Sequence, residues 1–157
     1  MRTPLSRLLA PVALGTALVL GACHPARPRT LEVQDAWARL APMPGRPAAA
    51  YLTIRGGGKA DRLVAITSPK VERIEMHSGG MEHGMATMHP IAGLDVPAGS
   101  EARFAPGGDH AMLFGVDPAI RPGDRLPLTL RFASGATLGT EARTIAAGDP
   151  APATAEK

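Results

Sequence analysis

The chain has 157 residues, of which 45% are hydrophobic and only 3% are aromatic, and a formal net charge of +3. This length suits one domain with an aliphatic core and is too short for two full-sized domains. Arg2 and Arg7 lie in the first 22 residues, which contain no acid, so the rest of the chain is almost neutral. No basic patch is interleaved with aromatic residues, which argues against nucleic acid as a partner.

Residues 1–22 predict a lipoprotein signal peptide. Arg2 and Arg7 give a positive start, and residues 8–20 form an apolar stretch too short to span a bilayer comfortably. The stretch ends in Leu20-Gly21-Ala22-Cys23, which resembles the bacterial lipobox. We therefore expect lipidation of Cys23 and a periplasmic lipoprotein anchored to a membrane. The alternative is an ordinary cleaved signal followed by an incidental cysteine.

The remaining chain predicts one all-β domain. Residues 23–30 contain two prolines and predict a short lipidated tether, residues 31–146 the folded domain, and residues 147–157 a disordered tail. Short strands between Gly and Pro turns favour a β-sandwich or Greek-key barrel. The expected strands are 36–40, 49–55, 62–67, 71–77, 86–91, 102–105, 110–116, 126–132 and 136–145, with residues 78–85 as the tip of a hairpin.

Histidine and methionine cluster between residues 76 and 112. Thioether sulfur is soft and imidazole binds copper well, so this mixture favours copper, as Cu(I) with Cu(II) as the alternative oxidation state. His110 and Met112 share a strand face because residues i and i+2 point the same way. His77 ends one arm of the expected hairpin and Met88 lies on the returning arm. Opposed strand residues have Cβ atoms about 4.5–5.5 Å apart, so these two pairs could close on one ion.

The other histidines and methionines of this stretch have different expected roles. Met76 directly precedes His77 in the expected strand, so its side chain should point to the opposite face, toward the core. Met81, His83 and Met85 are either an auxiliary copper-capturing arm or, as we favour, part of a solvated loop. Asp109 either orients the ring of the histidine that follows it or serves the turn.

The four candidate ligands have a family-specific spacing. His77, ten residues, Met88, twenty-one residues, His110, one residue and Met112 match the H-x10-M-x21-H-x-M signature of the periplasmic copper chaperones called PCu(A)C. Segments such as Asp35-Ala36-Trp37-Ala38-Arg39 also resemble that family, and the similarity covers about residues 31–133.

The resemblance implies a cupredoxin-like Greek-key β fold and a metallochaperone, not an enzyme. It further implies delivery of Cu(I) to the Cu(A) centre of cytochrome c oxidase, with subunit II of that oxidase or another copper acceptor as partner. Some family members bind a second copper in a His/Met-rich tail, but residues 146–157 contain neither residue type, so that function is not expected here.

Three other functions are alternatives to copper delivery. A blue-copper electron carrier needs a thiolate ligand, and the only cysteine, Cys23, lies outside the expected domain. A metal hydrolase is disfavoured because no H-E-x-x-H motif and no zinc-type ligand spacing occurs. Copper sequestration or resistance would use the same site without an oxidase partner, and it stays open.

Overall fold

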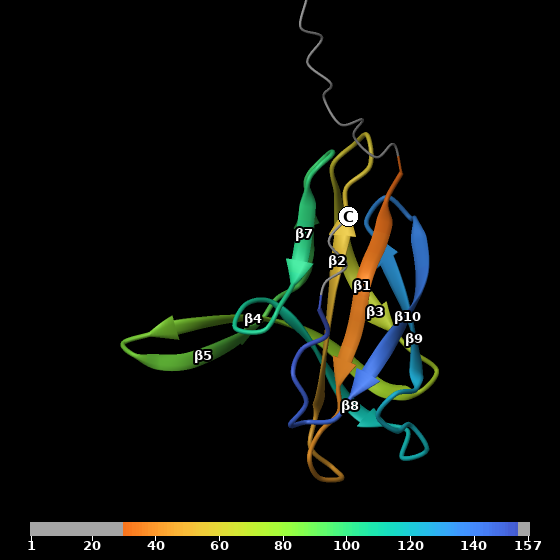
Figure 1. Ribbon diagram of the computed structural model, residues 1–157. Coiled ribbons are helices and arrows are strands. Elements are labelled where there is room, and N and C mark those ends of the chain that lie inside the picture. The colour runs from red at the N-terminus through yellow and green to blue at the C-terminus, as the bar shows by residue number, and fades with distance from the viewer. Residues whose placement is uncertain (1–29, 154–157) are drawn as a thin grey trace, which may run out of the picture.

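The computed structural model describes residues 30–153 (Figure 1). The expected signal peptide, Cys23, most of the tether and residues 154–157 of the tail lie outside the described residues. Residues 30–153 form strands and turns without any helix, and so contain no helix long and apolar enough to cross a membrane. The predicted all-β class is confirmed.

Ten strands form one continuous sheet. They are β1 Glu32–Arg39, β2 Ala48–Arg55, β3 Asp61–Thr67, β4 Val71–Glu82, β5 Met85–Pro90, β6 Leu94–Val96, β7 Glu101–Phe104, β8 His110–Val116, β9 Arg125–Phe132 and β10 Thr137–Ile145. The order is β5-β4-β8-β2-β1-β10-β9-β3-β6, and β7 pairs with β2 beside this path. The pair β1–β10 is parallel, and the other pairs are antiparallel. The strands at the two ends of this order, β5 and β6, are therefore edge strands.

The core is mostly aliphatic and lies on one face of the strands. Apolar residues occupy every second position of β9, and all four are at most 2% exposed: Leu126, Leu128, Leu130 and Phe132. Met76 of β4 and Ala111 and Leu113 of β8 belong to the same core, as expected for Met76. Because strand residues alternate between faces, the residues between these core positions point away from the core. That outer face of β4 and β8 carries the candidate site.

The β4–β5 hairpin is longer than the sequence predicted. The loop expected over residues 78–85 is wrong, because residues 79–80 pair with β5 and the ladder continues to a two-residue turn. In that turn His83 has φ 51° and Gly84 has φ 79°, as in a type I′ turn, whose twist matches that of the flanking strands. Figure 1 shows the hairpin projecting from the sheet, in green at the left. Residues 78–89, which extend beyond the end of β8, are called the arm below.

Two further differences from the expected strands exceed a shift of one residue. β1 begins four residues earlier than predicted, because the strand continues through an irregularity in which Asp35 adopts a positive φ of 51° and the register shifts between Gln34 and Trp37. Aspartate tolerates this left-handed conformation better than most residues. The short strand β6 was not predicted, since its three residues are too few to display a period.

Candidate metal centre

Two predicted ligands, His77 and His110, face each other across the pair β4–β8. They are Cα partners in the antiparallel ladder, and their ring centroids lie 6.0 Å apart with an interplanar angle of 29°. His110 is the first residue of β8 and is only 8% exposed, while His77 is half-buried. Directly opposed residues of an antiparallel pair project to the same face. The ladder therefore brings the two imidazoles together.

Met112 lies on the same face, one alternation further along β8. It is the Cα partner of Glu75 on β4 and of Ala49 on β2, and its side chain is half-buried. Since residues i and i+2 of a strand point the same way, Met112 and His110 are neighbours on the outer face. Three of the four predicted ligands thus share one small area of the sheet.

Met88 is placed differently from the other three. The residue opposite His77 is Pro90, and Met88 pairs with Gly79, two residues further out on the arm. Alternation still directs Met88 to the face of His77, and diagonal neighbours in a ladder lie about 7–8 Å apart, within reach of a long side chain. The side chain of Met88 is 57% exposed. We expected His77 at a strand end. The structure instead places it inside β4, where this strand extends beyond β8 and continues into the arm.

The ring of His110 is held by a backbone group. Its Nδ1 lies 2.8 Å from the carbonyl oxygen of Gly108, which accepts a hydrogen bond when Nδ1 carries the proton. This contact leaves Nε2 as the nitrogen with a lone pair. A Cβ atom at Gly79 would lie 2.8 Å from the same carbonyl oxygen, so the glycine lets the turn before β8 approach the arm. The carbonyl group of Gly108 thus holds the ring, whereas the sequence had offered either this role or a turn role for Asp109.

The ring of His77 is held by a side chain. Its Nε2 lies 3.1 Å from Oε2 of Glu75, and Oε1 of Glu75 accepts a hydrogen bond from Nη1 of Arg73. The guanidinium carbon of Arg73 in turn lies 4.2 Å from the ring centroid of Phe114. Glu75 was not predicted as a site residue, because its spacing of two residues from His77 places it on the same strand face but does not reveal the contact.

The second ring nitrogen of His77 has no partner. Among the side chains that the structure describes, Nδ1 of His77 is the only buried nitrogen or oxygen without a hydrogen bond. Leaving such a group unpaired costs about 1–3 kcal/mol, so it needs an explanation. Binding a metal ion is one way in which a buried imidazole nitrogen is satisfied.

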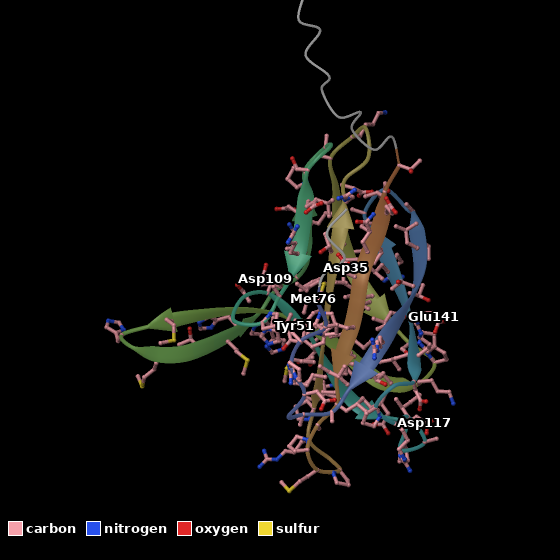
Figure 2. The ribbon with its side chains drawn as sticks, in the orientation of Figure 1. Asp35, Tyr51, Met76, Asp109, Asp117 and Glu141 are labelled. Carbon is pink, nitrogen blue, oxygen red and sulfur yellow. The ribbon has the colours of Figure 1, made fainter. Side chains whose placement is uncertain are left out.

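Two aromatic residues, one on β1 and one on β2, pack together on the strands that follow β8 in the sheet order. Tyr51 comes one residue after the part of β2 that pairs with β8, and its ring centroid lies 4.3 Å from that of Trp37. Burial raises the pKa of Tyr51, while the charge of Arg39 acts in the opposite direction. The phenol therefore stays neutral at ordinary pH. Figure 2 shows Tyr51, Met76 and Asp109 near the point where the arm joins the body.

The remaining candidates lie further out on the arm. Met81 and Met85 are 71% and 68% exposed, and they pair with Ala86 and Glu82 respectively. Because the chain reverses between them, they point to opposite faces, with Met81 on the face of His77. Met81 and Met85 therefore do not share a face, although they are four residues apart in the sequence. An auxiliary copper-capturing role for these residues stays a prediction.

The donor types also restrict the metal. Within residues 30–153, no group of three or more His, Cys, Asp or Glu side chains could hold a metal ion. A zinc-type site built from these ligands is therefore not found in this part of the chain. The donors that do converge are two imidazoles and a thioether, which are borderline and soft.

Known proteins with the same sequence pattern identify the family. The family model described as "Putative lipoprotein LpqE-like" matches residues 31–144. The chain belongs to the LpqE-like family. A relative from Leifsonia xyli subsp. xyli (strain CTCB07), "Putative lipoprotein Lxx21020", is 32% identical over 108 residues, which are 68% of this chain and 64% of that protein. The match thus spans a little less than two thirds of the relative's length.

Solved structures resemble this LpqE-like chain in fold. The copper-bound PCuAC domain from PmoF2 has a TM-score of 0.62 at 20% identity, over 77% of this chain and 96% of that domain. The solution structure of CuI-DR1885 from Deinococcus radiodurans has a TM-score of 0.54 at 28% identity, over 71% of this chain and 76% of that protein. The predicted PCu(A)C membership and the cupredoxin-like β fold are confirmed.

Proposed function

We propose that this LpqE-like protein is a copper chaperone that binds one Cu(I) through His77, Met88, His110 and Met112. The observation that carries the proposal is the shared outer face of β4 and β8, where two imidazoles and a thioether converge. All four donors are neutral, and thioether sulfur suits Cu(I) while it is a poor ligand for hard cations. The solved relatives that contain copper support the same metal. The protein binds and transfers the ion, and it is not an enzyme.

Transfer follows from the unequal exposure of the ligands. The side chain of Met88 is 57% exposed, whereas His110 is 8% exposed. An incoming ligand of an acceptor therefore reaches the Met88 side of the ion first and can replace this thioether while both imidazoles still hold the metal. Each later step exchanges one donor for another, so copper is never released free into water.

The acceptor and the location are proposed from the sequence. We propose that lipidated Cys23 and a tether over residues 23–30 hold the domain of residues 31–146 on a membrane in the periplasm. The family description as a lipoprotein supports the anchor. The proposed acceptor is the Cu(A) centre of subunit II of cytochrome c oxidase, or another copper acceptor. Anchoring to the membrane of such an acceptor raises the effective concentration of the chaperone.

The binding site is tested by copper titration of the purified protein under reducing conditions, with X-ray absorption to count nitrogen and sulfur ligands. We expect one tightly bound Cu(I) with two nitrogen and two sulfur neighbours. Replacement of any of the four ligands should weaken binding. Unchanged affinity in all four variants would show that the metal binds elsewhere.

The cellular role is tested in a deletion strain. Starved of copper, this strain should lose cytochrome c oxidase activity and regain it when copper is added. Normal oxidase activity at low copper, combined with hypersensitivity to excess copper, would instead favour sequestration or resistance by the same site.

A further inference from the structure

A chain of contacts on the outer face of β4 ends at His77. Arg73, Glu75 and His77 alternate along the strand, so all three side chains project from the same face. Arg73 lies over the ring of Phe114 and donates to Oε1 of Glu75, while Oε2 of Glu75 lies 3.1 Å from Nε2 of His77. The carboxylate is thus held on one side and faces the imidazole with its second oxygen.

This contact selects the tautomer of the ring. A neutral imidazole has one N–H donor and one lone pair, and a carboxylate oxygen can only accept. Nε2 must therefore carry the proton, which leaves the lone pair on Nδ1. Nδ1 is also the buried nitrogen that has no hydrogen-bond partner.

We propose that Glu75 is a positioning residue of the copper site, which accepts the Nε2 proton of His77 and thereby presents Nδ1 as the nitrogen that binds Cu(I). This inference rests on the proposed function and deepens it. In His110 the roles of the two ring nitrogens are exchanged, because Nδ1 faces the carbonyl of Gly108 and Nε2 is left for the metal. The two histidines therefore offer different ring nitrogens to the same ion.

Glu75 does not act as a ligand itself. A carboxylate is a hard donor and Cu(I) is a soft ion. Both oxygens of Glu75 are already engaged, and the ion pair with Arg73 balances its charge. A hydrogen bond from a ligating histidine to a carboxylate fixes the ring orientation and makes the other nitrogen a stronger donor.

The experiment compares Glu75→Leu and Glu75→Gln with Glu72→Leu as the matched control. Leucine removes the acceptor at similar size, whereas glutamine keeps an acceptor oxygen without the charge. Glu72 lies on the same strand but on the opposite face, and it is exposed. Two quantities are measured for each purified protein: the tautomer of His77 without metal, by long-range proton–nitrogen NMR correlations under conditions that keep the imidazole neutral, and the Cu(I) affinity, by competition with a chelator.

We expect the wild-type His77 to show the Nε2–H tautomer. In Glu75→Leu the Nδ1–H form should appear and Cu(I) affinity should fall about 10–100-fold, the usual effect of losing an outer partner of a metal ligand. Glu75→Gln should recover part of the affinity, and Glu72→Leu should leave both quantities unchanged.

An Nδ1–H tautomer in the wild-type protein would overturn the inference, and so would unchanged affinity in Glu75→Leu. The wild-type spectrum and the glutamine variant decide the question even if the leucine variant does not fold. A wild-type chain that binds no Cu(I) would refute the proposed function, while the metal-free spectrum would still test the contact between Glu75 and His77.

Discussion

The two halves of the candidate site differ in how firmly the fold holds them. His110 and Met112 lie on β8, which has β4 on one side and β2 on the other. Met88 lies on β5, an edge strand, and its side chain is 57% exposed. Local stability follows buried contacts, so the β8 half is fixed and the arm half is free to adjust. In the proposed copper site, the β8 half would retain the ion while the arm half exchanges its ligand.

The largest expected difference between the two halves concerns folding. Leu113 of β8 is fully buried, so Leu113→Ala should lower the free energy of unfolding by about 2–5 kcal/mol. Met88→Ala on the arm should change it by less than about 0.5 kcal/mol, because an exposed side chain contributes little. Urea unfolding of both variants measures this. Equal losses would mean that the arm is as integral to the fold as β8.

The ligands themselves should differ in the same direction. His110→Ala should weaken Cu(I) binding by more than about 100-fold, since even an outer partner of a ligand is worth 10–100-fold. Met88→Leu should weaken it by about tenfold, or 1.4 kcal/mol, because an exposed side chain must be ordered before it binds. Chelator competition compares the two. A greater loss in Met88→Leu would place the anchor of the site on the arm.

The junction between the halves can be tested at two adjacent glycines. In Gly79→Ala the new Cβ would lie 2.8 Å from the carbonyl oxygen of Gly108, the group that orients His110. We expect Cu(I) affinity to fall about tenfold, within the range for lost outer partners of metal ligands. Gly80→Ala is the control, because its Cβ meets only Oγ1 of Thr87 at 3.7 Å. Similar losses in both variants would point to a general effect on the arm.

The smallest expected effect lies at the outer end of the arm. Met81 is 71% exposed and is farther from His110 than Met88 is along the ladder. Met81→Leu should therefore leave the equilibrium affinity for Cu(I) unchanged in the same competition assay. A clear loss would assign Met81 to the site and extend it along the arm.

Much of the fold followed from the sequence because the strands have clear periods. Apolar residues occupy every second position from Leu126 to Phe132, the period of a strand with one buried face, and the spacing of His110 and Met112 predicted a shared face. The extent of the arm could not be predicted in this way, since Gly79 and Gly80 are typical of turns but here lie inside a ladder.

The site was predicted less completely than the fold. The offset between His77 and Met88 depends on the length of the turn between their strands, and a period of two cannot fix that length. Glu75 looked like an ordinary charged residue on a solvated strand, because its role appears only when its contact with His77 is known. Likewise, the carbonyl of Gly108 has no side-chain signature at all.

The exposure of the arm has a chemical consequence beyond access. Thioethers in contact with solvent are converted by peroxide to sulfoxides, which are polar and no longer soft sulfur donors. Met88 is open to this reaction, whereas Met112 is half-buried against the sheet. Oxidative stress is therefore expected to damage the arm half of the candidate site first. A reductase for methionine sulfoxide would restore the thioether, so the proposed copper site depends on repair as well as on folding.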